Sequence, residues 1–310
     1  MTRNYMHWYR SQKPLWLIFV ILWSGQAYGQ SPGWKAAFSL VVPGLGQAMN
    51  GDVPEAGAHW MTFNVLLKQY TDLTGREDYL TGDRRIDPAK PIIYTNKTTF
   101  YADVYGQALN FISFYSAYGA YRDARNQMQN AGYNTPAPPD SLSDILLAPF
   151  NPAYLFRPST LLVLAVPLYY LTQPPGQQEY LYMPDNTITR EEMKRGFAAE
   201  FIMTAAGEEA FYRGTLNNSF SSAWGPGWGL AASSLAFGLA HQGAPGQANI
   251  ASATLAGMYL GYLQQENDYH IGQSVAIHFW WDFLISLSML ATRKTAEIPY
   301  VRLFSFAYQY

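Results

Sequence analysis

The sequence has no cysteine, so disulfide bonds, thiolate zinc sites, iron–sulfur clusters and a cysteine nucleophile are all excluded. Charge is also scarce: Asp, Glu, Lys and Arg make up 14% of the 310 residues, against roughly 25% in an ordinary soluble domain. With a formal net charge of -2 the chain offers no basic surface, and we expect no nucleic-acid partner. Any catalysis must therefore use carboxylate, imidazole or hydroxyl groups.

In place of charge the chain has apolar side chains, which make up 49% of its residues. They gather in stretches separated by Pro, Gly and polar connectors, a pattern typical of helices joined by loops. The predicted helices are 36–49, 56–70, 104–122, 142–156, 159–171, 190–216, 227–241, 247–264 and 273–291. Several are shorter than the roughly 20 residues that cross a bilayer. Such helices could be re-entrant, tilted against a thinned bilayer, or buried in a bundle. We predict an all-α fold, a multi-pass helical membrane bundle.

The first residues have the features of a targeting segment. Basic residues precede an apolar run at 15–23, and small residues follow it at the spacing that a signal peptidase recognises. We predict a signal peptide over 1–29, with an uncleaved signal anchor as the alternative because the run is near the length boundary between the two. We divide the remainder into an N-terminal membrane-associated helical domain, 30–173, and a C-terminal domain, 174–310.

A local motif marks the start of the longest predicted helix. Thr189 and Glu192 have the spacing of a capping box, in which each side chain accepts the other residue's backbone amide proton. We therefore interpret the acidic pair Glu191-Glu192 as structural, and the helix begins at Arg190.

Ionisable side chains recur in the apolar helices of the C-terminal domain, where each charge at membrane depth costs about 2.5–3.5 kcal/mol. They are Glu208, Glu209, Arg213, His241, His278 and Asp282. Glu209 with Arg213 and His278 with Asp282 are each four residues apart, so each pair shares a helix face and can interact. Groups that cost this much are expected to have a function.

Each feature also has a purely structural interpretation. His241 could be an imidazole favoured by the dipole at a helix C-terminus. Glu209 with Arg213 could be a clamp, and His278 with Asp282, beside two tryptophans, could be an interfacial anchor. Their joint occurrence on successive helices of one short region favours a functional site over three unrelated structural features.

The order and spacing of these residues resemble a known family. The motifs are Glu208-Glu209-x-x-x-Arg213, Phe237-x-x-x-His241 and His278-x-x-x-Asp282. Over about residues 189–290 they resemble the CAAX-protease and bacteriocin-processing (CPBP, or Abi) intramembrane proteases. The family's third motif ends in Asn or Asp, so Asp282 is a permitted variant that brings a further charge or holds a proton. In the N-terminal half, residues 43–47 (Pro-Gly-Leu-Gly-Gln) resemble a turn motif of uncharacterised bacterial membrane domains.

The resemblance implies an intramembrane endopeptidase that acts on membrane-associated proteins by a glutamate-activated water. The family's general base maps onto Glu208, with His241 sharing the water, while His278 and Asp282 would support the oxyanion or orient the peptide. A low dielectric would favour the protonated form of Glu208, and an adjacent guanidinium would keep Glu209 ionised. The classical zincin motif His-Glu-x-x-His is absent. Histidines and carboxylates could still bind zinc, but we favour a reaction without a cofactor.

Two other interpretations remain open. A membrane scaffold or immunity protein would use the same buried polar residues for packing, and a proton-coupled carrier would use intramembrane Glu and His. A carrier usually has related halves, and we find no internal repeat. Alternating aromatic residues in 304–310 predict at most a short terminal strand or an interfacial segment. We expect the partners to be a lipid bilayer and a membrane-associated protein or peptide substrate. We expect the protein to be located in a bacterial inner membrane.

Overall fold

The computed structural model describes residues 31–80, 96–172, 188–241 and 250–291. These residues form helices and turns with no strand among them, which confirms the predicted all-α class. The predicted signal segment, the boundary near residue 174 and the aromatic C-terminus lie outside the described ranges. Within those ranges, no helix combines the length with the apolarity that crossing a bilayer requires.

The described residues contain the following helices in chain order. They are α3 (Pro32–Val41), α4 (Leu45–Met49), α5 (Val53–Thr74), α6 (Glu77–Leu80), α7 (Lys97–Gln127), α8 (Leu142–Leu147), the 3-10 helix η1 (Ala148–Phe150), α9 (Pro152–Leu155), α10 (Pro158–Thr172), α11 (Arg190–Glu208), the π-helix η2 (Glu209–Asn217), α12 (Asn218–Trp224), α13 (Pro226–Ala240), α14 (Ile250–Glu266) and α15 (Gly272–Ala291).

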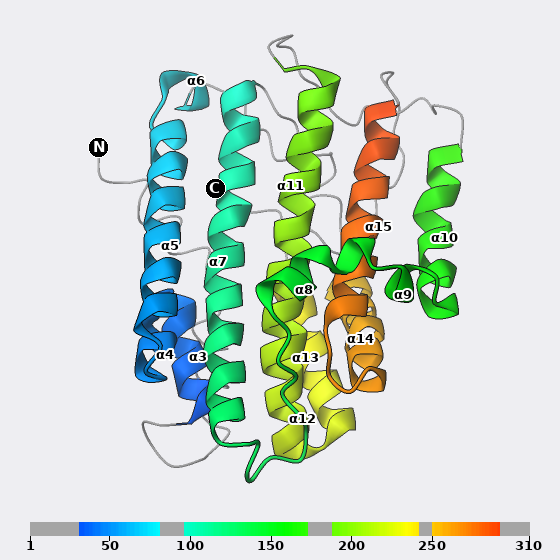
Figure 1. The fold of residues 1–310 in the computed structure, drawn as a ribbon. Helices are drawn as coiled ribbons and strands as arrows, with labels where there is room; N and C mark the ends of the chain where they lie inside the picture. Colours follow the sequence, from blue (N-terminus) through cyan, green and yellow to red (C-terminus); the bar gives the residue numbers. More distant parts are fainter. Residues whose placement is uncertain (1–30, 81–95, 173–187, 242–249, 292–310) are drawn as a thin grey trace.

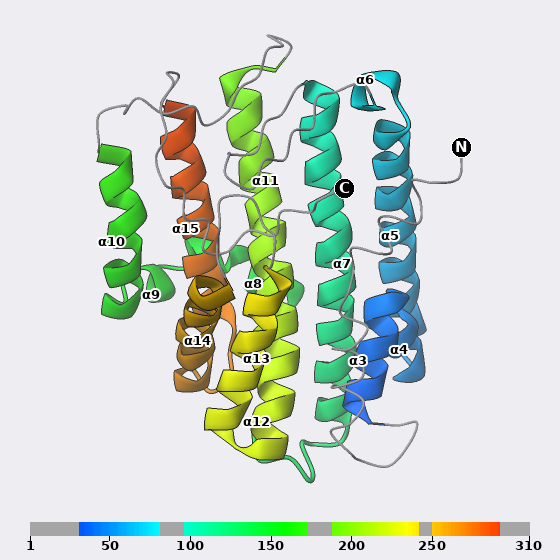
Figure 2. The same ribbon diagram turned by 180° about the vertical axis from the view of Figure 1, so that it is seen from behind.

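Five long helices form a row in the order α5, α7, α11, α15, α10, and each packs on its neighbours (Figure 1). Helices α3, α13 and α14 cover one side of this row, nearest the viewer in Figure 2. The short segment α8–η1–α9 crosses the opposite side (Figure 1). The helix α11 continues through η2 into α12, so the predicted helix 190–216 is present but is longer and not uniformly α-helical.

Side-chain caps set the starts of the long helices. The predicted capping box is confirmed: Thr189 Oγ1 accepts from the Glu192 backbone N–H at 3.1 Å, and Glu192 Oε2 accepts from the Thr189 N–H at 2.9 Å. Lys97 Nζ, in the first turn of α7, donates to Glu192 Oε1 at 2.8 Å. Its hydrogen bond and those of Thr189 lower the pKa of Glu192 to about 2, so this carboxylate is ionised near neutral pH. The starts of α7 and α11 are thereby joined.

Proline and glycine interrupt two helices that the sequence predicts as continuous. The stretch 142–156 breaks into α8, η1 and α9 because Pro149 and Pro152 cannot donate backbone hydrogen bonds. The stretch 36–49 breaks into α3 and α4 at Gly44, whose φ of 96° lies in the left-handed region.

The turn at Gly44 is packed directly on α7. Gly44 N–H donates to Ser116 Oγ at 2.8 Å, and Gln47 Nε2 donates to the Ser116 carbonyl at 2.8 Å. Ser39 Oγ donates to Gln47 Oε1 at 2.8 Å and accepts from the Gly46 N–H at 2.7 Å. The polar groups of the Pro-Gly-Leu-Gly-Gln motif therefore anchor α3 and α4 to α7.

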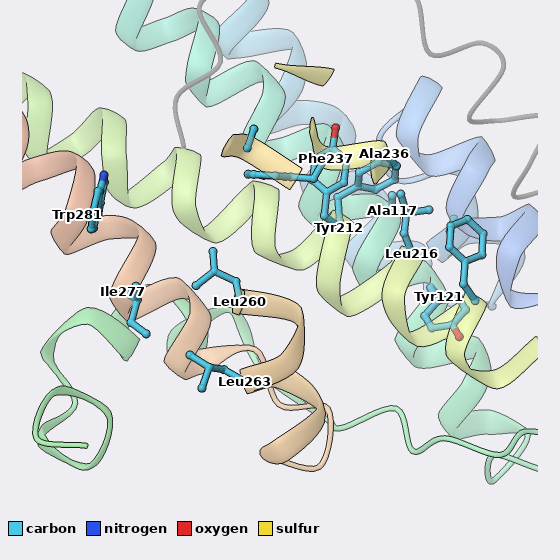
Figure 3. Close-up of a cluster of buried hydrophobic side chains, with 14 of the residues drawn as sticks. Ala117, Tyr121, Tyr212, Leu216, Ala236, Phe237, Leu260, Leu263, Ile277 and Trp281 are labelled. Atoms are coloured by element: carbon cyan, nitrogen blue, oxygen red, sulfur yellow. The ribbon is translucent and has the colours of Figure 1, made fainter. Parts of the chain in front are cut away.

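Two hydrophobic clusters form the core, and both contain residues from before and after residue 174. One contains Tyr121 of α7, which lies beside Leu216 of η2, and extends to Ile277 of α15 at its other end (Figure 3). In the other, Phe100 of α7 meets Phe197 of α11 edge-on, with 5.5 Å between ring centroids. The helices that carry the ionisable residues are thus held by the N-terminal half of the chain.

A matched pair of glycine substitutions tests the turn. A Cβ at Gly44 would stand 2.3 Å from the Ala56 carbonyl oxygen, whereas a Cβ at Gly51, which also has a positive φ of 86°, would meet no atom within 4 Å. We expect Gly51→Ala to cost about 1–2 kcal/mol of backbone strain and Gly44→Ala distinctly more, because the clash adds to the strain. Melting temperatures of the two purified variants measure the difference. Equal losses would contradict the packing of this turn.

Candidate active site

The candidate site is built around the point where α11 becomes a π-helix. Glu208 is the last residue of α11 and Glu209 is the first of η2. Segments of π-helix inside α-helices are rare and frequently occur at functional sites. This one packs closely on α7, since a Cβ at Gly214 would lie 2.4 Å from ring atoms of Tyr118. The absence of a side chain at Gly214 therefore allows the two helices to approach.

Glu209 is at the centre of the polar contacts and has no exposed surface. The ion pair predicted from the four-residue spacing is present, with Arg213 Nε 3.1 Å from Glu209 Oε2. The other oxygen, Oε1, lies 2.8 Å from Nδ1 of His278 on α15. Paired with the guanidinium, the carboxylate accepts this hydrogen bond and the imidazole Nδ1–H donates it. One carboxylate thereby fixes both an arginine side chain and the orientation of a histidine ring.

The other nitrogen of His278 faces two further carboxyl groups. His278 Nε2 is 3.6 Å from Oδ2 of Asp282 and 3.8 Å from Oε2 of Glu208. Glu208 is only 2% exposed, and none of the described residues donates a hydrogen bond to its Oε2. Glu209 Oε2 likewise accepts no hydrogen bond of good geometry, but it lies 3.1 Å from Arg213 Nε, whereas Glu208 has no guanidinium at that distance among the described residues. The two adjacent glutamates therefore differ: Glu209 is fixed between two cationic partners, and Glu208 keeps an oxygen available to a further donor.

The charges of this cluster do not cancel when every carboxyl group is ionised. Three carboxylates stand against one guanidinium, and a protonated His278 still leaves one negative charge in excess. Since an uncompensated buried charge costs several kcal/mol, neutrality requires one further proton. The site is thus suited to taking up and releasing a proton.

His241 follows the last residue of α13 and is fully buried. Its Nδ1 lies 2.7 Å from the carbonyl oxygen of Phe237, which can only accept, so Nδ1 carries the proton. In the neutral ring Nε2 then carries the lone pair. The structural interpretation of His241 as a group at the end of a helix is therefore compatible with an acceptor role for Nε2.

The ring of Phe237 connects the three motifs. It lies 4.3 Å from the His241 ring centroid and 6.4 Å from that of His278. The Arg213 guanidinium carbon stands 4.2 Å from the Phe237 centroid, a cation–π geometry. Tyr212 packs edge-on against the same ring, and Figure 3 shows the two aromatic side chains together in the core. All six ionisable residues of the sequence prediction therefore lie on or around one buried cluster.

Sequence reasoning missed the contacts that α14 makes with this cluster. The Gly257 carbonyl accepts from Arg213 Nη2 at 3.4 Å, and the Gln264 side chain bonds the backbone of η2. Two signals were available: the spacing Gly257-x-x-x-Gly261, which permits close helix approach, and a Gln in an otherwise apolar helix.

Metal binding has no support in the donor geometry. Within the described part of the chain, no group of three or more His, Asp or Glu side chains is arranged to hold a metal ion. Glu209 and His278 Nδ1 already serve as each other's partners.

Comparison with known proteins agrees with the motifs. Residues 195–284 match the family described as type II CAAX prenyl endopeptidase Rce1-like, a protease family. This segment contains Glu208, Arg213, His241, His278 and Asp282. No curated protein and no solved structure matches the chain. The resemblance of the C-terminal half to the CPBP proteases is thereby confirmed.

The ion pair at Glu209 gives a stability prediction. Glu209→Gln keeps the side-chain shape but leaves Arg213 as an uncompensated buried cation, which should cost about 3–5 kcal/mol. Adding Arg213→Met removes the stranded charge, so the double variant should recover part of that loss. Melting temperatures of the purified variants measure both effects.

The matched control is Arg213→Met in a Glu208→Gln background. Because Glu208 is not paired with Arg213, the second substitution should give no recovery there. If Arg213→Met stabilised both glutamine variants equally, the assignment of the pair to Glu209 would be wrong.

Proposed function

We propose that this protein is an endopeptidase that hydrolyses peptide bonds of membrane-associated proteins with a water molecule activated by Glu208. The observation that carries the proposal is the difference between the two adjacent glutamates. Glu209 lies 3.1 Å from the Arg213 guanidinium and 2.8 Å from His278 Nδ1, whereas Glu208 has no guanidinium partner among the described residues and lies 3.8 Å from His278 Nε2. The match to a protease family over residues 195–284 supports the same reaction class.

In the proposed reaction, Glu208 takes a proton from water as the water oxygen attacks the peptide carbonyl carbon. The C–N bond then breaks, and Glu208 returns the proton to the leaving amine. His241 Nε2 accepts the second hydrogen bond of the water, and His278 Nε2–H, shared with Asp282, donates to the developing oxyanion. Glu209 and Arg213 keep the imidazole of His278 in place.

We propose a bilayer as the surroundings because apolar side chains cover much of the outer surface. Helices α10 and α13 contain no charged residue. Large exposed apolar side chains include Trp60, Met61 and Val65 on α5, Leu161, Leu162, Val166 and Tyr169 on α10, Trp228 and Leu235 on α13, and Leu255 and Tyr262 on α14. Exposed apolar surface of this extent is typical of contact with lipid or another apolar partner. The multi-pass arrangement and the bacterial inner membrane belong to this proposal.

The role of Glu208 is tested by Glu208→Gln. The substitution keeps the shape of the side chain and removes only the proton acceptor, so the fold should persist while the rate falls by roughly 10²–10⁴. Glu191→Gln is the matched control, because this exposed glutamate on the same helix pairs only with Lys194, at 3.1 Å. Proteomes of cells that carry each form are compared for peptide termini in membrane proteins that depend on Glu208.

Termini that vanish with Glu208→Gln and persist with Glu191→Gln support the protease. Identical proteomes from both variants would favour the alternative, a non-catalytic scaffold or immunity protein that uses the buried polar cluster for packing.

A second test concerns the metal. We propose that the reaction runs without one, so the purified protein should keep its rate of peptide cleavage after exhaustive chelation. Loss of cleavage that zinc alone restores would contradict the metal-free mechanism and would favour the zinc alternative.

A further inference from the structure

Helix α14 contains none of the motif residues. The side-chain amide of one of its residues nevertheless forms hydrogen bonds with η2 and with the turn before α15, the elements next to the site. Gln264 is fully buried. Its Nε2 donates to the Arg213 carbonyl at 2.9 Å and to the Tyr269 carbonyl at 3.2 Å. Its Oε1 accepts from Asn217 Nδ2 at 2.6 Å. A buried amide with every group satisfied, on three separate partners, fixes the relative positions of those partners.

Two of these partners lie in the π-helix. Arg213 is in the middle of η2 and Asn217 is its last residue, so Gln264 holds the segment at two points one turn apart. Asn217 Nδ2 also points to the Gly261 carbonyl at 3.4 Å. The backbone that Gln264 holds at Arg213 carries the side chain that pairs with Glu209. By holding the backbone of η2, the Gln264 amide therefore helps to fix the position of the acidic pair Glu208-Glu209.

The third partner lies in the turn before α15. Asp268 and Tyr269 have φ values of 51° and 67°, a left-handed turn that ends just before Gly272 begins the helix. Ser274 Oγ then donates to the Leu260 carbonyl at 2.9 Å, which adds a second tie between α15 and α14. The position of this turn sets where α15 begins. It therefore also sets the height of His278 relative to the residues of η2.

We infer that Gln264 is a positioning residue for the proposed hydrolysis: by tying η2 to the turn before α15, it sets the placement of Glu208 and Glu209 against His278. The inference rests on the proposed function. A displacement of about 1 Å at a catalytic group can cost on the order of 10²-fold in rate. Loss of this tie should therefore lower kcat much more than it changes KM.

The next residue provides a matched control. Gln265 Nε2 lies within hydrogen-bond distance of Asn217 Oδ1 at 3.3 Å, Ser221 Oγ at 3.2 Å and the Pro226 carbonyl at 2.9 Å. These partners lie at the end of η2, in α12 and at the start of α13. Gln265 therefore has the same chemistry and a similar number of contacts, but it does not join η2 to the turn before α15.

The experiment compares Gln264→Met with Gln265→Met in the full chain. The substrate is a fluorogenic peptide that spans a Glu208-dependent cleavage site from the proteome comparison, and the readouts are melting temperature, kcat and KM. We expect Gln264→Met to lower kcat by roughly 10–100-fold with KM within twofold of wild type. Gln265→Met should lose less stability, because its side chain is only partly buried, and should keep its kcat.

Wild-type kcat in folded Gln264→Met, or equal kcat losses in the two variants, would overturn the inference. If Gln264→Met does not accumulate, Gln264→Glu replaces it, with Gln265→Glu as its control. The introduced carboxyl group can donate to a carbonyl only when it is protonated, so activity relative to wild type should rise on acidification for Gln264→Glu alone. A ratio that does not vary with pH would overturn the inference as well.

The proposed function and the positioning role fail in different ways. If no peptide terminus depends on Glu208 in the proteome comparison, the protease proposal itself fails. Inactive Glu208→Gln together with wild-type kcat in Gln264→Met leaves the protease in place and removes only the role of Gln264.

Discussion

The arrangement of the site depends on one buried carboxylate. Glu209 accepts from His278 at 2.8 Å and pairs with Arg213 at 3.1 Å, and all three side chains are shielded from solvent. In water these contacts would contribute little, but in a dry core breaking them leaves an uncompensated charge. The carboxylate therefore fixes the orientation of His278, and the second nitrogen of that ring is directed at Glu208 and Asp282. Glu208 differs from its neighbour in that it has no ion pair with Arg213 and only a longer contact, 3.8 Å, with His278.

Such a cluster requires a core large enough to exclude water, and the N-terminal half helps to provide it. Helix α7 runs alongside α11 and η2 from Lys97, which bonds Glu192, to Tyr118, which packs on Gly214. Helix α14 closes the other side through Gly257 and Gln264. The chemistry is concentrated in a few side chains, while the low-dielectric surroundings are built from most of the described helices.

The sequence predicted the elements with local causes and missed those that depend on packing. The capping box at Thr189 and the pair of Glu209 with Arg213 follow from spacing within one helix, and both are present. The π-helix was not predictable, because i→i+5 hydrogen bonding has no residue pattern of its own and arises from contacts with α7 and α14. The contact between His278 and Glu209 joins residues 69 positions apart. The family resemblance indicated that these motifs belong together, but it did not assign a partner to each atom.

The close contact between Gly214 and Tyr118 also limits how the two halves of this chain can diverge. A side chain at position 214 would overlap the tyrosine ring, so any larger residue there requires a smaller one at position 118. The two positions are therefore constrained to vary together, although one lies outside the segment that matches the protease family and the other within it. A chimaera that joins this C-terminal half to a foreign N-terminal half would have to reproduce the complementary surface on α7.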